Sequence, residues 1–348
     1  MPLHFQIILA VVIALVLSLA STPVVKWFAH KVGAIDVPKD SRRVHKNPIP
    51  RLGGLAIFIG FILSVLFMAE IDMQVRGVLI GSVVIVVLGV IDDIYTLKAY
   101  IKFFVQIIAA LIAVFHSVVI EIFSNPFAVG GGYGSEFVFL GVLAIPITVI
   151  WIVGITNSVN LIDGLDGLAV GVSTISAVVM LIIALMVSYP NVAIIMAALA
   201  GACIGFLPYN FNPAKIFMGD TGALLLGYLL ATVSIIGLFK FYAVVSIAAP
   251  LLILALPLID TSFAFIRRLV KGQNPMAPDR GHFHHRLIDM GLTQKQAVTV
   301  LYVVSGLLGI VAVVITTSAQ MRVLILVIAV LIAAAVIFFI FRKNRNGK

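Results

Sequence analysis

The chain has 348 residues, of which 62% are hydrophobic and only 11% are charged, and its mean hydropathy is +1.21. Soluble globular domains are about half apolar and about a quarter charged, so water cannot be the main solvent of this surface. The net charge of +9 does not indicate nucleic-acid binding, because membrane proteins collect Lys and Arg in their cytoplasmic loops. The single cysteine, Cys203, excludes a disulfide framework and a thiolate metal site.

Apolar segments of about 20 residues recur along the whole chain, which is the length that spans a hydrocarbon core as a helix. They lack the alternating pattern of a membrane β-barrel. We therefore predict an all-α, polytopic membrane protein with about 11 transmembrane helices and a single domain over residues 1–348. The predicted spans are 3–28, 52–69, 76–92, 101–120, 138–155, 167–188, 191–209, 221–239, 243–266, 297–317 and 321–341.

The distribution of charge orients these spans. No Lys or Arg precedes the first apolar segment and Lys26 follows it, so we expect a retained helix with the N-terminus outside and the C-terminus in the cytoplasm. On this map 20 of the 23 Lys and Arg residues lie on the cytoplasmic side. Ten of the 14 acidic residues lie there too, although acids contribute little to topology. We therefore expect the chemistry on the cytoplasmic face.

The first cytoplasmic motif is the pair Asp92-Asp93, at the end of the third predicted span. Adjacent carboxylates at a membrane boundary repel each other and are costly to desolvate unless a cation neutralises them. Lys98 and Lys102, four residues apart on one predicted helical face, are candidates for neutralising the acids or binding phosphate. The alternative is a charge cluster that only marks the end of the helix.

The second motif is NSVNLIDGLDGLAVG, residues 157–171. Its polar residues recur every third position, which keeps them on one side of a helix or tight turn, and the interleaved glycines let a ligand approach the backbone. Amide and carboxylate oxygens are ligands that Mg²⁺ accepts beside water and phosphate oxygens. A polar break between two spans is the simpler alternative. The candidates are Asn157, Asn160, Asp163 and Asp166.

The third motif is PYNFNPAKIFMGDTGALLLG, residues 208–227. Asp220 precedes an apolar helix, so it either caps that helix or combines with the helix amides to hold a metal-bound phosphate. Phe217 and Lys215 are nearby candidates for contacting a base and a phosphate.

Two cytoplasmic loops carry further basic residues. In the predicted loop 267–296, a histidine segment with flanking arginines is suited either to zinc or to phosphate. We favour phosphate because no cysteine is near. In residues 40–57, Lys46 precedes a Gly-Gly pair at the start of the second span. The candidates in the longer loop are Arg280, His282, His284 and His285.

Together these motifs offer oxygen ligands for a divalent metal and cations for phosphates, the requirements of phosphoryl transfer. In these residues the chain resembles the polyprenyl-phosphate N-acetylhexosamine-1-phosphate transferases over essentially its whole length. The paired aspartates, NxxNxxDGxDGL, NPxKxFMGDxG and HxHH occur in the family's order. RLGG at 51–54 and HFHHRL at 282–287 resemble the WecA/TagO branch.

The resemblance implies an eleven-span enzyme of the bacterial plasma membrane with a cytoplasmic active site. It implies Mg²⁺ as the cofactor, with Mn²⁺ as a substitute, and transfer of N-acetylglucosamine-1-phosphate from UDP-GlcNAc to undecaprenyl phosphate. The resemblance leaves open whether the protein assembles as a homodimer. The implied catalytic residues are Asp92, Asp93, Asp163 and Asp166; the metal ligands are Asp220, Asn160 and Asp93; the substrate-binding residues are Lys46, Asn157, Phe217, Lys98, Arg280, His282, His284 and His285.

Two alternatives remain open at this point. A phospho-N-acetylmuramoyl-pentapeptide transferase is the alternative within the family, although that branch has a Thr-Met pair before the glycines and a HHHFE-type loop. An ion-coupled transporter is the alternative from another class, because intramembrane acids often mark ion pathways. Transporters place such sites near the bilayer midplane, often between repeated halves, whereas these acids lie at span ends.

Overall fold

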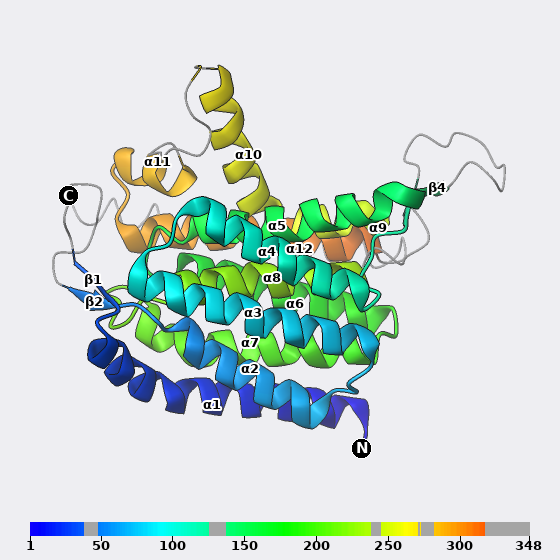
Figure 1. Ribbon diagram of the computed structural model, residues 1–348, viewed down its shortest axis with the longest axis horizontal. Coiled ribbons are helices and arrows are strands. Elements are labelled where there is room, and N and C mark those ends of the chain that lie inside the picture. The colour runs from blue at the N-terminus through cyan, green and yellow to red at the C-terminus, as the bar shows by residue number, and fades with distance from the viewer. Residues whose placement is uncertain (38–47, 125–136, 238–244, 271, 273–281, 317–348) are drawn as a thin grey trace.

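The computed structural model describes residues 1–37, 48–124, 137–237, 245–270, 272 and 282–316. Within these ranges most helices run side by side in a bundle (Figure 1). The helices are α1 (Leu3–Val32), α2 (Gly54–Met68), α3 (Met73–Tyr95), α4 (Ala99–Phe115), η1 (Gly141–Leu143), α5 (Ala144–Ile162), α6 (Leu168–Met186), α7 (Pro190–Asn210), α8 (Gly219–Gly237), α9 (Val245–Ile253), α10 (Ala255–Val270), α11 (Phe283–Asp289) and α12 (Gln294–Thr316).

The bundle has the composition of a membrane protein. Seven of the described helices are long and apolar enough to cross a bilayer, namely α1, α3, α5 with η1, α6, α7, α8 and α12, and the apolar helices α2 and α4 are shorter. A helix satisfies its own backbone hydrogen bonds in hydrocarbon. The prediction of a polytopic helical membrane protein is therefore confirmed. The predicted span 321–341 lies outside the described residues.

Helix α8 forms the centre of the bundle, and every residue from Thr221 to Gly237 is buried. Glycines on the neighbouring helices α2 and α3 allow these helices to pack closely against α8. A Cβ atom on Gly54 of α2 would lie 2.1 Å from the Gly222 amide nitrogen, and one on Gly89 of α3 would lie 2.3 Å from the Thr221 Cα atom. Small residues let membrane helices pack backbone to backbone. This packing brings the start of α2 and the last turns of α3 against the start of α8.

The predicted span 243–266 is wrong as a single helix, because the chain breaks between α9 and α10 at Leu254. Pro257 has no amide hydrogen to donate to the Ile253 carbonyl. That carbonyl instead accepts a hydrogen bond of 3.1 Å from the hydroxyl of Ser176 on α6. Freed backbone groups within a membrane need such a partner. Helix α10 then leaves the bundle at a steep angle (Figure 1).

Other predicted boundaries also differ. Residues 137–139 form strand β4 (Phe137–Phe139), which pairs with β3 (Ile122–Ser124), and the following helix α5 continues to Ile162 rather than 155. Strands β1 (Ile35–Asp36) and β2 (Ile49–Pro50) form a second antiparallel pair. The all-α prediction missed these two short pairs. The predicted loop 267–296 contains the end of α10, all of α11 and the start of α12.

The two ends of the bundle differ. Strands β1 and β2 and helix α11 lie at one end, on the left of Figure 1, and the N-terminus and β4 lie at the other. The predicted acidic motifs lie in the last turns of α3, at the end of α5 and the turn after it, and at the start of α8, all at the end of the bundle that carries β1 and β2.

Candidate active site at one end of the bundle

The carboxylate of Asp93 joins the end of α3 to the start of α8. Its Oδ1 atom accepts the Asp220 amide at 3.0 Å, and its Oδ2 atom accepts the Thr221 amide at 3.0 Å and the Thr221 hydroxyl at 2.6 Å. The first amides of a helix have no hydrogen-bond acceptor within that helix, and the Asp93 carboxylate on α3 accepts the first amides of α8 instead. Gly219 has φ +69°, and a Cβ atom there would lie 2.4 Å from Asp93 Oδ2.

The side chain of Asp220 therefore does not act as the cap that the sequence allowed. It contacts two other helices instead. The Lys102 ammonium lies 2.9 Å from Asp220 Oδ2 and 2.9 Å from Asp92 Oδ2, and the Asn160 amide donates to Asp220 Oδ1 at 3.1 Å. The Leu97 amide donates to the other oxygen of Asp92 at 2.6 Å. One lysine thus neutralises carboxylates that lie 128 positions apart in sequence.

Lys98 does not share this position. It is the N-cap residue of α4, with extended backbone angles of φ −67° and ψ 142°, so the four-residue spacing of a helical face does not apply to it. Its side chain is exposed and does not line the cavity described next. The expectation that Lys98 and Lys102 act on one face is wrong for this reason.

A cavity of about 310 Å³ opens beside these residues. Seven residues predicted from sequence line it: Asp93, Asn160, Asp163, Asp166, Phe217, Asp220 and His285. Seven further residues complete the lining: Asp36, Arg51, Gly164, Leu165, Asn210, Gly219 and Gln294. The cavity thus gathers segments that are remote in sequence.

Arg51 is a basic residue whose position the sequence does not explain. Its Nε atom donates to the Asp93 carbonyl at 3.2 Å and lies 3.9 Å from Asp93 Oδ1. The Arg51–Gly54 segment is held against the Phe217–Met218 backbone, where the Gly53 amide donates to the Phe217 carbonyl at 2.9 Å. In sequence Arg51 is one more cation of a predicted cytoplasmic loop, and such cations usually act as topology anchors. The RLGG context was the only available signal.

Asp163, just after α5, has an unusual electrostatic environment. Burial, together with the charges of Asp220, Asp93 and Asp166, raises the pKa of its carboxyl to about 8. No described residue donates a hydrogen bond to this carboxylate. The cavity therefore contains more negative charge than its cations neutralise, which is the condition under which a bound divalent cation would be stabilised.

Asp166 is held by the loop that precedes α8. Its Oδ2 atom accepts the Asn212 side-chain amide at 2.9 Å and the Ala214 amide at 3.0 Å. Asn212 also donates to Gln294 of α12 at 2.8 Å. Asp166 thus fixes the segment that leads to Phe217, and it lines the cavity as well.

Asn157 lies outside the cavity. Its side chain donates to Gln106 Oε1 on α4 at 2.5 Å and to the Val153 carbonyl at 2.8 Å. Because α5 ends at Ile162, the three-residue spacing continues along a helix only to Asn160, and the acids that follow lie in the turn. The single polar helical side expected for residues 157–166 is therefore wrong beyond Asn160, and Asn157, one helical turn further into the bundle, does not reach the cavity.

The histidine segment reaches the cavity from α11. The rings of His282 and His284 are parallel within 5° at a centroid distance of 5.7 Å, and the His284 and His285 rings are 4.3 Å apart. A Cβ atom on Gly164 would lie 2.3 Å from His284 Nε2. Burial and the neighbouring His285 lower the pKa of His284 to about 4. Lys46 and Arg280 lie outside the described residues.

Among the described residues, no group of three or more His, Cys, Asp or Glu side chains is arranged to hold a metal ion. The oxygen atoms of Asp220 and Asn160, with Asp163 beside them on the cavity wall, are nevertheless of the type that Mg²⁺ prefers.

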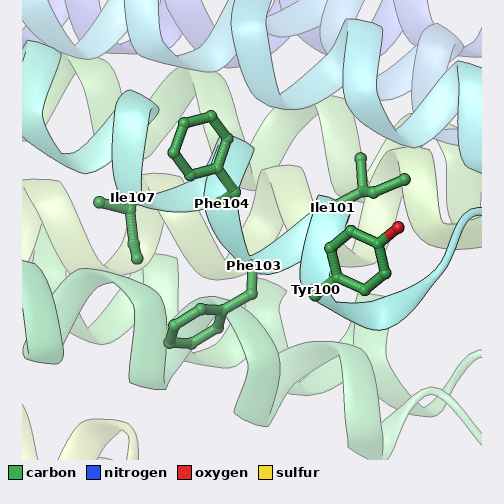
Figure 2. Close-up of a pocket in the computed structure, with 5 residues that line it drawn as sticks. All are labelled: Tyr100, Ile101, Phe103, Phe104 and Ile107. Atoms are coloured by element: carbon green, nitrogen blue, oxygen red, sulfur yellow. The ribbon is translucent and has the colours of Figure 1, made fainter.

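A second hollow, of about 430 Å³, lies on the outer surface of α4 (Figure 2). Its walls are almost wholly apolar and consist of Tyr100, Ile101, Phe103, Phe104 and Ile107. Helix α4 therefore turns Lys102 toward the acids and aromatic side chains away from them. Phe104 is 64% exposed, which is expected only where a nonpolar solvent or ligand covers it.

Comparison with known proteins gives a consistent picture. The family model described as glycosyl transferase family 4 matches residues 75–238. The chain is 42% identical over 90% of its length to 86% of a probable undecaprenyl-phosphate N-acetylglucosaminyl 1-phosphate transferase of Bacillus subtilis. It is 34% identical over 88% of its length to 81% of a decaprenyl-phosphate N-acetylglucosaminephosphotransferase of Mycobacterium tuberculosis. It is also 36% identical over 66% of its length to 75% of a phospho-N-acetylmuramoyl-pentapeptide-transferase of a Thermoanaerobacter species.

Proposed function

Since the chain belongs to glycosyl transferase family 4, we propose that it transfers N-acetylglucosamine-1-phosphate from UDP-GlcNAc to undecaprenyl phosphate. A phosphate oxygen of the lipid attacks the sugar-linked phosphorus of the nucleotide. The bond from that phosphorus to the bridging oxygen breaks, and UMP leaves with the electron pair. The other product is undecaprenyl-diphosphate-GlcNAc, so the reaction is the first membrane step in making a cell-surface polymer.

The observation that carries this proposal is the position of Lys102 between Asp92 and Asp220 at 2.9 Å from each. Phosphoryl transfer needs little covalent chemistry from the protein, which mainly positions the reactants and stabilises charge. Lys102 and Arg51 are cations held by buried acids beside the cavity. They are thus oriented before substrate arrives, which is the condition for effective stabilisation of charge in the transition state.

Asp92 and Asp93 act in this proposal as orienting groups rather than as bases. Asp93 already accepts three hydrogen bonds from the start of α8, and Asp92 holds Lys102. A phosphate dianion needs no base to attack phosphorus. The two acids instead fix the lysine and the first turn of α8 relative to each other.

Mg²⁺ is the cofactor of this proposal, with Asp220, Asn160 and Asp163 as the side chains that would hold it and with Mn²⁺ as a substitute. When bound, it would neutralise the diphosphate of the nucleotide sugar. The excess negative charge around Asp163 supports this assignment. Binding is measurable without catalysis: millimolar Mg²⁺ should raise the melting temperature of the wild-type protein in detergent, and much less that of Asp163→Asn. An equal rise in both proteins would remove Asp163 from the metal site.

The lipid acceptor is expected to lie along α4. The apolar hollow of Figure 2 is lined by Ile101 and Phe103, which flank Lys102 in the sequence of α4. A polyprenyl chain on this surface would bring its phosphate to the lysine without leaving the nonpolar phase.

We place the cavity on the cytoplasmic side of the bacterial plasma membrane. The cavity end carries Arg51 and Lys102, and cytoplasmic loops are enriched in such cations. UDP-GlcNAc supplied outside sealed right-side-out vesicles should give no product, whereas inverted vesicles should be active. The opposite result would reverse the orientation.

Purified protein with UDP-GlcNAc, undecaprenyl phosphate and Mg²⁺ tests the activity itself. We expect UMP to appear only when the lipid is present, to be lost with EDTA, and to be absent from Asp220→Asn protein of normal melting temperature. UMP release from UDP-MurNAc-pentapeptide but not from UDP-GlcNAc would assign the chain to the other branch of its family. No UMP from either donor would favour an ion-coupled transporter.

A further inference from the structure

Asp260 is a buried acid with no part in the site described so far. It lies in the second turn of α10, is 4% exposed, and does not line the cavity. Both of its oxygen atoms contact the start of α11. Oδ2 lies 2.8 Å from His282 Nδ1, and Oδ1 accepts the Phe283 amide at 2.8 Å. One carboxylate thus holds a side chain and a backbone amide that follow it by 22 and 23 residues.

These contacts define the state of His282. A carboxylate can only accept hydrogen bonds, so Nδ1 of His282 carries a hydrogen and its ring plane is fixed. His282 is 5% exposed, so water does not compete for this position. The Phe283 amide is one of the first amides of α11 and has no partner within the helix. Asp260 therefore sets both the ring and the point at which α11 begins.

Two further histidines connect the His282 ring to the cavity. The His284 ring is parallel to that of His282 and rests against Gly164 in the cavity wall. His285 lies against His284 and lines the cavity directly. The orientation of the His282 ring therefore bears on His284, which packs so closely on Gly164 that a Cβ atom there would lie 2.3 Å from His284 Nε2.

We propose that Asp260 is a positioning residue that sets where His285 meets the phosphates of the nucleotide sugar, acting through His282 and His284. This inference rests on the proposed function, because it assumes that the cavity binds a nucleotide sugar. Asp260 touches no substrate. Its effect should appear in the binding of the nucleotide sugar and in the rate, but not in the binding of the lipid.

Asp260→Asn is the informative variant, because it keeps the shape of the side chain. Its amide oxygen can still accept the Phe283 amide, but its amide nitrogen must donate to His282 Nδ1 and forces the other tautomer. We expect KM for UDP-GlcNAc to rise about tenfold, the effect of losing one charged hydrogen bond. KM for undecaprenyl phosphate should stay within about twofold, since residues without shared partners act independently.

Asp289→Asn is the matched control, because Asp289 is an exposed acid at the end of α11, the helix whose start Asp260 contacts. It should behave like wild type. His282→Gln tests the same contact from the other side and should resemble Asp260→Asn. The double variant should be no worse than the more affected single one, because the two residues act as one unit.

Three outcomes would overturn the inference. Asp260→Asn could match Asp289→Asn, its effect could add to that of His282→Gln, or KM for both substrates could rise equally with a lower melting temperature. If Asp260→Asn does not fold, His282→Gln alone decides: unchanged KM for UDP-GlcNAc overturns the inference. If wild-type protein releases no UMP, the proposed function fails instead, which separates the two failures.

Discussion

The carboxylate of Asp93 at the end of α3 accepts the backbone amide and the hydroxyl of Thr221 in the first turn of α8, at 3.0 and 2.6 Å. These two residues are separated by 128 positions. Their contact joins the pair of acids to the Gly-Asp-Thr-Gly turn, and Lys102 and Asn160 then bind Asp220 beside it. Residues from three other helices of the candidate site therefore all contact the start of α8.

Asp93→Asn should damage both stability and activity. One of its oxygen atoms becomes an amide nitrogen that faces backbone donors, so buried groups lose their partners at a cost of about 2–4 kcal/mol. We expect a lower melting temperature and at least a roughly hundredfold loss of UMP formation, as seen when a preorganised electrostatic group is removed. Asp72→Asn is the control, because Asp72 caps α3 at the other end of the bundle through Val75 at 2.8 Å. It should cost about 1 kcal/mol of stability and leave turnover intact.

Lys102→Met should lower turnover far more than Lys98→Met. Removing Lys102 leaves Asp92 and Asp220 without their shared cation, and we expect about a hundredfold loss or more. Lys98 is exposed, so its replacement should change turnover by no more than about threefold, as exposed charges usually contribute little. Measuring UMP release by both variants tests this difference in turnover. A larger loss for Lys98→Met would restore it to the substrate site.

Gly164→Ala should displace the histidine segment, because the new Cβ atom would lie 2.3 Å from His284 Nε2. Gly154→Ala on the same α5–α6 region is a matched control, since a Cβ atom there meets nothing within 4 Å. We expect Gly164→Ala to cost about 1–3 kcal/mol, as overpacking does, and to raise KM for UDP-GlcNAc. Equal kinetics for the two alanine variants would contradict the placement of His284.

The burial of His284 predicts a dependence of stability on pH. Its pKa of about 4 lies below the ordinary value of about 6.5, so between these values the unfolded chain binds a proton that the folded chain does not. Stability from this residue is therefore present above about pH 6.5 and is lost as the pH falls toward 4. Between pH 7.5 and pH 5.0 the melting temperature should fall more for wild type than for His284→Gln. The same fall in both would show that other groups are responsible.

Phe104→Gln tests the apolar surface of α4. If the polyprenyl chain lies on it, a polar side chain there should raise KM for undecaprenyl phosphate by up to about thirtyfold, since burying an apolar ring contributes about 2 kcal/mol, while KM for UDP-GlcNAc stays constant. Phe115→Gln is the control, because Phe115 is similarly exposed but ends α4 at the far side of the bundle. Matching lipid KM values for the two variants would place the acceptor elsewhere.

The sequence by itself determined the class of fold and the set of candidate groups. Hydrocarbon solvent forces apolar segments of about 20 residues into helices, so the class of polytopic helical membrane protein was visible without any tertiary information. Acids in so apolar a chain are costly unless they are used, and seven of the predicted residues duly line one cavity.

Only the tertiary structure decided which partner each group has. Lys98 and Lys102 looked equivalent in sequence, but α4 begins after Lys98 and only Lys102 reaches the acids. The break at Leu254 depends on a serine from α6 that accommodates the carbonyl of Ile253. Asp260 reaches His282 because α10 leaves the bundle. Such contacts are set by how helices pack and where they end, and local periodicity carries no information about either.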